Sequence, residues 1–277
     1  MIYLCIAVLA STGTFFGMRY TESHHGNRYA ATVFTFIVCT ILSYLIMDEK
    51  VLFYNSREGL FTLLLAVFNG ICMTAGMLVI RSSTGRNGTP MTTTFSKLGV
   101  LIPTIVSIAL FSEIPTAIQM VGIAMAVFAI VMINRTGDAG VKDVKLLMVV
   151  LIVRGTADLN TKLFDVYGEP AMKELFTFYT FFLCMIISFV IMLVKDRNMT
   201  AGDIIAGSIT GIPNQMGLYF TLLAVSRMPA YAVFPILSAG VILAVSIINY
   251  LIFKEKPSKQ EKYAMVIIAA SLVLINI

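Results

Sequence analysis

The 277-residue chain has few charged residues. Asp, Glu, Lys and Arg make up 13% of it and hydrophobic residues 58%, whereas charged residues make up about 25% of a soluble globular domain. So little charge excludes an ordinary soluble domain. The composition therefore predicts a protein that spends most of its length inside a lipid bilayer.

The sequence also lacks the motifs of several function classes. It has no Walker A motif, so we expect no transport powered by ATP bound to this chain. The four cysteines form no CxxC pair, and His24 and His25 have no partners at metal-ligand spacing, so no metal or cofactor is expected. The Lys and Arg residues are scattered without interleaved aromatics, which argues against nucleic acid as a partner.

What the sequence does contain is a series of apolar stretches of about 20 residues, the length that an α-helix needs to cross a bilayer. Ten such spans are predicted. They lie at 2–18, 29–47, 60–80, 91–111, 116–134, 144–164, 171–194, 203–225, 230–253 and 259–277. The fold class that follows is an all-α integral membrane protein with ten transmembrane helices.

Short motifs occur twice along the chain at nearly one separation. "FSEIPT" matches "FKEKPS", "VMIN" matches "VLIN", Gly13-Thr14 matches Gly155-Thr156, and Gly70-Ile71 matches Gly211-Ile212. This register predicts two homologous five-helix halves, 1–138 and 139–277, in one compact membrane domain. Because five is odd, the second half enters the bilayer inverted, an arrangement known from secondary transporters.

The sequence around the fourth and fifth spans also resembles a known family. "TFSKLGVLIPTIVSIALF", then "SEIPT", Gln119, Gly122 and an apolar helix ending in "IN" are similar to the EamA-type members of the drug/metabolite transporter superfamily. The resemblance extends over nearly the whole chain. It implies a carrier with a central cavity lined by helices of both halves. Such carriers handle small metabolites, including amino acids, sugars, nucleosides and drugs, and often export them.

The distribution of Lys and Arg predicts the orientation, because cytoplasmic loops are enriched in them. Most of these residues follow the odd-numbered spans. The bias places both termini outside the cytoplasm, in a multi-pass protein of the cell membrane. Many ten-span relatives are expected to keep both termini in the cytoplasm, so this chain would depart from that habit.

Two cations lie inside the spans, where an ionisable residue costs about 2.5 to 3.5 kcal/mol and marks a functional site by default. Arg154 is about 12 to 13 Å from either end of its helix, close to the midplane. Asp158 is four residues further on the same face, so it can pair with Arg154. The alternatives are a structural ion pair and a contact to an anionic group of the substrate.

Lys97 is less deep, roughly 9 Å from the end of its span. Its side chain either snorkels to the interface or faces the cavity and contacts substrate. The same helix carries Thr94 and has Gly99 and Pro103 close by. Since Pro103 frees the carbonyl of Gly99, we expect a kinked, polar helix and treat Gly99 and Pro103 as gating positions.

Polar residues in two further spans are predicted to contact substrate. Pro213, Asn214 and Gln215 lie in the middle of the eighth span, where a helix break is expected. Asn69 lies in the corresponding helix of the first half. Each of these side chains could instead make an interhelical hydrogen bond.

The leading hypothesis is a secondary transporter of small metabolites, an exporter of amino acids or related anionic or zwitterionic solutes. Its partners are then a small-molecule substrate and the lipid bilayer. The alternatives are a drug, nucleoside or sugar efflux carrier of the same family, a non-transporting sensor or scaffold, and an intramembrane enzyme. The enzyme is disfavoured, because Asp158 is the one clear acid within the spans.

Overall fold

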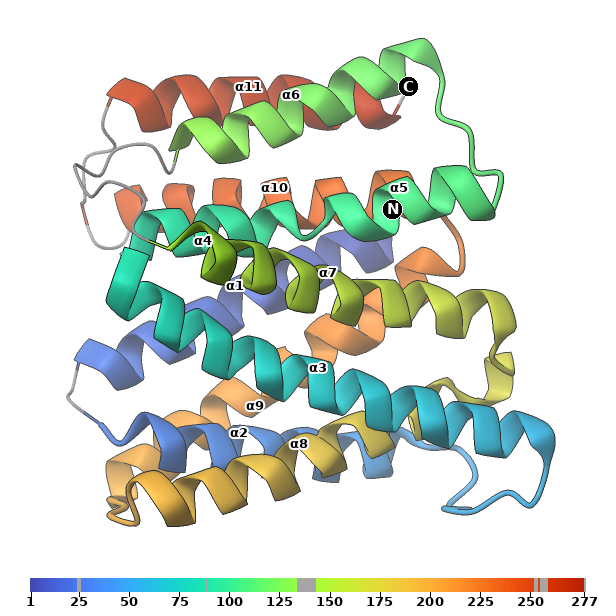
Figure 1. Cartoon of the computed structure of the whole chain (residues 1–277), viewed down its shortest axis with the longest axis vertical. Coiled ribbons are helices and arrows are strands. Elements are labelled where there is room, and N and C mark those ends of the chain that lie inside the picture. Colours follow the sequence, from blue (N-terminus) through green and yellow to red (C-terminus); the bar gives the residue numbers. More distant parts are fainter. Residues whose placement is uncertain (24–25, 88, 134–142, 252–253, 255–258, 277) are drawn as a thin grey trace. The chain divides into compact units, whose positions relative to one another are not determined.

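The computed structural model describes residues 1–23, 26–87, 89–133, 143–251, 254 and 259–276. These residues form helices and connecting turns, without a strand (Figure 1). The helices are α1 (Ile2–Ser23), α2 (Arg28–Ile46), α3 (Arg57–Asn87), α4 (Thr89–Leu98), α5 (Leu101–Leu110), α6 (Ala117–Ile133), α7 (Val144–Tyr167), the short 3₁₀ helix η1 (Pro170–Met172), α8 (Lys173–Lys195), α9 (Ala201–Val225), α10 (Ala230–Leu251) and α11 (Lys259–Asn276). Every expected span therefore corresponds to a helix, and the fourth span is divided into α4 and α5.

Local hydrogen bonds set where the helices begin. At α6, Thr116 N donates to Gln119 Oε1 at 2.9 Å and Gln119 N donates to Thr116 Oγ1 at 3.3 Å. At α9, Thr200 and Asp203 exchange the same two bonds at 2.9 and 3.3 Å. Such reciprocal capping satisfies backbone N–H groups that a helix start leaves without partners.

The helices pack into two compact units. Unit 1 comprises Met1–Thr74 and Leu163–Leu223, and unit 2 comprises Ala75–Lys162 and Ala224–Ile277. Each unit thus combines helices from both halves of the sequence, and the unit boundaries fall within α3, α7 and α9. The repeat boundary expected near residue 138 lies outside the described residues.

In unit 1, α2 packs against α8 (Figure 1). The two helices are antiparallel, because Asn27 at the start of α2 donates from Nδ2 to the Asp196 carbonyl just after α8, at 3.2 Å. At the other end, the rings of Tyr44 and Phe178 lie 6.0 Å apart. Bonds and ring contacts at both ends therefore fix the register of this pair.

The α9 helix of unit 1 runs from Ala201 to Val225 without interruption, so the break expected at Pro213 is not formed. Glycines bring α9 close to its neighbours. A Cβ at Gly211 would lie 2.7 Å from the carbonyl oxygen of Thr35 on α2, and one at Gly13 on α1 would lie 3.2 Å from Cβ of Pro213. Close packing on both sides holds α9 helical despite the hydrogen bond that the proline cannot donate.

In unit 2, α6 packs against α11 and α5 packs against α10 (Figure 1). Gly122 allows α6 to approach α11, since a Cβ there would lie 3.0 Å from the Ile275 nitrogen. Ala126, Ala129 and Ile130 on α6 are fully buried.

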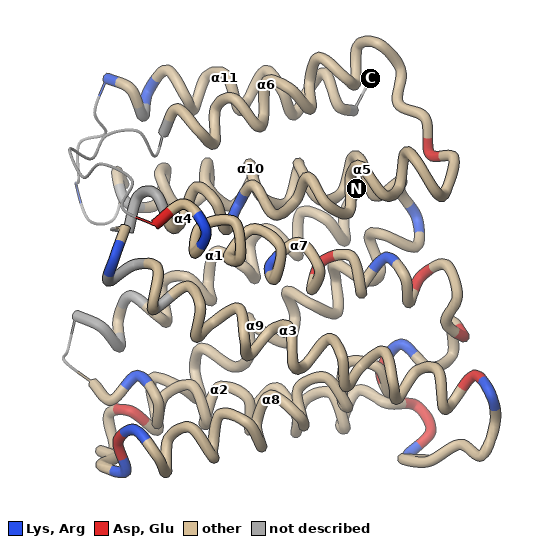
Figure 2. The backbone as a smooth tube through the Cα atoms, in the orientation of Figure 1, with Lys and Arg blue, Asp and Glu red and all other residues tan. Residues whose placement is uncertain are grey.

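The surfaces of the helices fit a membrane environment. Many large apolar side chains are exposed, among them Leu110, Phe128 and Val194, and the charged residues gather mostly at helix ends and in connections (Figure 2). Within the described residues, five helical stretches are long and apolar enough to cross a bilayer: Arg28–Ile46, Arg57–Ile80, Thr92–Leu110, Pro170–Lys195 and Ala230–Ile248.

Candidate functional site

The expected kink in the fourth span appears in unit 2 as a short turn that divides the span into two helices. Helix α4 ends at Leu98 and α5 begins at Leu101, with Gly99 and Val100 forming a turn. Pro103 has no N–H to donate to the Gly99 carbonyl, which accepts from Ile102 N at 3.0 Å instead. The Gly99 carbonyl is therefore not free, contrary to the expectation from sequence.

Helix α7 passes this break at backbone contact. A Cβ at Gly99 would lie 2.9 Å from the nitrogen of Gly155 and 3.0 Å from the carbonyl oxygen of Leu151. A Cβ at Gly155 would collide with the Gly99 carbonyl oxygen and with Ile102. Only glycine at both positions permits this approach. Arg154, which precedes Gly155, therefore lies beside the break.

Three charged side chains gather at this crossing. Lys97, Arg154 and Asp158 are each half-buried, and Lys97 and Asp158 interact electrostatically with each other and with Arg154. Lys97 lies in the last turn of α4, where the helix dipole favours a cation. The structure therefore brings together the three ionisable residues that the sequence singled out.

The direct Arg154–Asp158 ion pair considered from the sequence is not formed. Close ion pairs elsewhere in unit 2 include Arg86–Asp143 at 3.1 Å and Lys162–Glu113 at 2.7 Å. The Arg154 stem instead lies against α3, since a Cβ at Gly76 would be 3.3 Å from its Cδ.

Polar side chains at the end of α3 connect it with the start of α4 and with the residue before α7. Thr92 Oγ1 and Ser83 Oγ lie 2.8 Å apart, and both residues are buried. Asn87 Nδ2 donates to the Asp143 carbonyl at 3.2 Å, and its Oδ1 accepts from Asp143 N at 2.7 Å. Thr94, predicted to line the cavity, is 5% exposed.

Sequence reasoning missed a buried ion pair at the other end of α7. Lys162 is 4% exposed, and its Nζ is 2.7 Å from Oε1 of Glu113 and 5.8 Å from the ring centroid of Phe111. Oε2 of Glu113 accepts from the Ala230 N–H at 2.7 Å, at the start of α10. In the sequence, the signal of burial is the position of Lys162 eight residues after Arg154, on the same helix face.

The remaining predicted contact residues belong to unit 1. Gln215 on α9 is 1% exposed, and neither of its amide atoms has a hydrogen-bond partner among the described residues. Asn214 is half-buried, and its side chain approaches the Cys39 thiol of α2. Asn69 on α3 is 1% exposed. An unpartnered buried amide is costly, so Gln215 is the residue of this group that points to a polar ligand or water.

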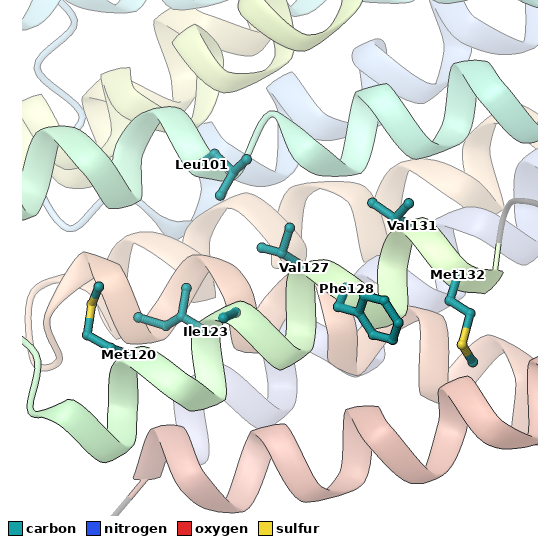
Figure 3. Close-up of a pocket in the computed structure, with 8 residues that line it drawn as sticks. Leu101, Met120, Ile123, Val127, Phe128, Val131 and Met132 are labelled. Atoms are coloured by element: carbon teal, nitrogen blue, oxygen red, sulfur yellow. The ribbon is translucent and has the colours of Figure 1, made fainter.

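A cavity of about 540 Å³ in unit 2 lies along α6. Residues of α6 from Met120 to Met132 form one side and Leu101, the first residue of α5, lies across from them (Figure 3). All lining residues are apolar, and Met120 and Phe128 are half or more exposed. The side chains that line the groove offer no charged or polar group to a solute.

Within the described residues, no group of three or more His, Cys, Asp or Glu side chains is arranged to hold a metal ion.

Comparison with known proteins identifies a family for most of the second half of the chain. Residues 163–277 match the model of the EamA-like transporter family. Residues 163–277 are an EamA-like transporter domain. The resemblance expected from the sequence is thereby confirmed for residues 163–277. EamA transporters are typically carriers without enzymatic activity.

The fold is also that of a solved protein. A structure titled "Crystal structure of protein" matches with a TM-score of 0.79 and 12% sequence identity, over 99% of this chain and 94% of the other. At that identity the likeness shows the fold alone. No curated protein matches the chain.

Proposed function

We propose that this EamA-like protein is a secondary carrier with ten transmembrane helices in two inverted five-helix repeats, and that it exports amino acids or related anionic or zwitterionic solutes. The observation that carries the proposal is the helix break at Gly99, with Lys97, Arg154 and Asp158 gathered around it. Discontinuous helices with charged or polar groups mark the substrate sites of secondary transporters.

A second repeated motif supports the inverted repeat. "TVFTFIVCTILS" at 32–43 in α2 matches "TFYTFFLCMIIS" at 177–188 in α8, with identical Thr, Phe, Cys and Ser residues in the same places. Its separation is three residues longer than that of the "FSEIPT" pair. The two matched helices pack antiparallel against each other, as helices related by an inverted repeat would.

Glycine contacts within unit 1 follow the same symmetry. A Cβ at Gly70 on α3 would lie 3.0 Å from the carbonyl oxygen of Thr180 on α8, and one at Gly211 on α9 would lie 2.7 Å from that of Thr35 on α2. Gly70 corresponds to Gly211 and Thr35 to Thr180 in the two repeats. The charges depart from this symmetry: Gly13 matches Gly155, so the partner of Arg154 is Thr12. We infer that Arg154 serves the substrate rather than the scaffold.

The charge of the crossing favours an anionic group on the substrate. Lys97 and Arg154 together outweigh Asp158 by one positive charge, in a half-buried setting where charges interact more strongly than in water. A carboxylate or phosphate that binds there neutralises this excess. A zwitterionic amino acid fits as well, because Asp158 offers an acceptor for its ammonium group.

A second candidate is an efflux carrier of nucleosides, sugars or drugs. The unpartnered amide of Gln215 favours it, because an amide donates and accepts hydrogen bonds without requiring a charge on the ligand. An uncharged substrate would depend on Gln215 and Asn214 and not on Lys97 or Arg154. Measurements on variants of the two groups therefore distinguish the candidates.

The test is solute flux in proteoliposomes without ATP. We expect saturable flux of anionic or zwitterionic solutes, a loss of about 10-fold or more in Arg154→Gln, and a smaller loss in Lys97→Gln, because each removes a charge-assisted contact of about 1.5–3 kcal/mol. Lys145→Gln, which changes an exposed lysine at the start of the same helix, is the matched control. Unchanged flux in both site variants would reject the anionic site.

The orientation is part of the same proposal. With both termini outside, a reporter that is active only in the cytoplasm is expected to be silent when fused after residue 277. Reporter activity at that position would place the C-terminus inside and contradict the charge bias.

A further inference from the structure

Unit 1 contains a pair of free thiols that transport does not explain. Cys39 on α2 and Cys184 on α8 are both 0% exposed and unpaired. They occupy the same place in the motif that α2 and α8 share, "FIVC" in one and "FFLC" in the other. The repeat thus places one thiol on each of two helices that pack together.

The register of the helix pair puts the two thiols at the same level. Cys39 is twelve residues after Asn27, and Cys184 is twelve residues before Asp196. Asn27 and Asp196 are hydrogen-bonded across the antiparallel pair, so equal steps along the two helices bring Cys39 opposite Cys184. The thiols belong to one buried cluster with Phe36 and Phe181.

Each thiol donates a hydrogen bond to a glycine carbonyl of a neighbouring helix, α9 for Cys39 and α3 for Cys184. Cys39 Sγ–H donates to the Gly211 carbonyl at 3.2 Å, and Cys184 Sγ–H donates to the Gly70 carbonyl at 3.5 Å. These two bonds are related by the repeat and direct the thiols to carbonyls of α9 and α3, and no disulfide joins the two sulfur atoms. Thioether sulfurs are near as well, since Met73 and Met185 pack against the same cluster.

We propose that Cys39 and Cys184 form a binding site for one soft monovalent metal ion of the Cu(I) type. Soft thiolate and thioether ligands select Cu(I), and such ions accept two sulfur ligands in a linear arrangement, so a pair of thiols on facing helices is sufficient. Hard cations need several oxygen ligands, which this apolar cluster does not supply.

Charge balance favours a monovalent ion. When the ion binds, one thiol loses its proton to water or a buffer base, and a sulfur–metal bond replaces the sulfur–hydrogen bond. The second sulfur donates a lone pair, no electron is transferred, and the net charge of the cluster stays zero. Neutrality matters because an uncompensated charge in an apolar interior is strongly disfavoured.

Silver(I) is the probe, because it is soft, monovalent and not readily reduced or oxidised. The parent is the full-length protein in detergent with Cys5→Ala and Cys72→Ala, so that the pair holds its only cysteines. We expect this parent to bind one Ag(I) per chain by isothermal titration and to unfold at a higher temperature with the ion than without it. Adding Cys39→Ser or Cys184→Ser is expected to abolish both effects.

The matched control is the same parent with both Cys39 and Cys184 replaced by serine, so that it contains no thiol; it is expected not to bind Ag(I). If the serine variants do not fold, Cys39→Met in the parent keeps a soft sulfur ligand and is expected to bind Ag(I) more weakly. X-ray absorption of the Cu(I)-loaded parent is expected to show sulfur ligands alone. No one-to-one binding by the parent, unchanged binding without the pair, or a shell of oxygen and nitrogen ligands would overturn the proposal.

Discussion

Glu113 and Lys162 provide the sharpest test of how unit 2 is held together. Glu113→Leu removes the carboxylate that pairs with Lys162 Nζ at 2.7 Å and accepts from the Ala230 N–H at 2.7 Å. The Lys162 side chain is 5% exposed, so its ammonium group would be left buried without its carboxylate. Breaking a buried pair in this way costs about 3–5 kcal/mol, and losing a helix cap costs about 1 kcal/mol.

Two further variants separate these contributions. Glu113→Leu with Lys162→Met replaces both charges by apolar groups, which is often neutral for a buried pair, so we expect most of the loss to be recovered except for the cap. Arg86→Gln breaks the more exposed Arg86–Asp143 pair, in which the Arg86 side chain is 69% exposed and that of Asp143 28%. This change is expected to lower the free energy of unfolding by about 1 kcal/mol or less.

The assay is unfolding in detergent followed by far-ultraviolet circular dichroism, because the chain is helical and contains no Trp. The reasoning predicts that Glu113→Leu destabilises the protein far more than Arg86→Gln and that Lys162→Met restores much of the loss. A Glu113→Leu protein as stable as Arg86→Gln would refute the buried pair, and so would a double variant less stable than Glu113→Leu alone.

Three further predictions follow from single contacts. Gly155→Ala puts a Cβ into the Gly99 carbonyl, so we expect a loss of stability of about 1–3 kcal/mol and reduced flux. The control is Gly202→Ala, where a Cβ meets only Thr200 Oγ1 at 3.5 Å and thermal stability should be equal or higher. Equal behaviour of the two variants would contradict the close crossing. The Leu146 N–H and then Arg86 hold the pKa of Asp143 below its ordinary 3.8, so its ionised form stabilises the fold above that pH and this contribution is lost as the pH falls through the lowered value; Asp143→Asn should flatten the acid limb of the thermal-stability profile, and an unchanged limb would count against it. Gln215→Leu removes an unpartnered buried amide, which costs about 1–3 kcal/mol, so thermal stability without ligand should rise; lower stability would indicate that the amide is satisfied.

The sequence predicted the helices well because each span is a long apolar run between polar connections. All ten expected spans have a helix at nearly the expected residues. The fourth span shows the limit of such reasoning: Pro103 and Gly99 signalled a distortion, but the break at Gly99 is set by α7, whose backbone at Gly155 fills the space that a side chain would need. That contact joins residues far apart in sequence.

Pro213 shows the same limit: it predicted a break, but neighbouring helices hold α9 continuous. The burial of Lys162 likewise depends on Glu113, which is distant in sequence and becomes its partner only in the fold. The match between α2 and α8 is hard to recognise from the sequence alone, because its separation differs by about three residues from that of the other repeated motifs. The residues that gather at the break, Lys97, Arg154 and Asp158, were all predicted, because an ionisable side chain within an apolar span is conspicuous whatever the tertiary structure.

The most direct test of the central claim is ligand binding to the purified protein, measured as a shift of its thermal unfolding midpoint across a panel of metabolites grouped by charge. A ligand that binds the folded state stabilises it by about 2.7 kcal/mol at 100 times its Kd. Our account predicts that solutes with a carboxylate or phosphate stabilise the wild-type protein and lose this effect in Arg154→Gln, while Lys145→Gln behaves as wild type. Stabilisation by uncharged or cationic solutes alone, or an equal shift in Arg154→Gln, would contradict it.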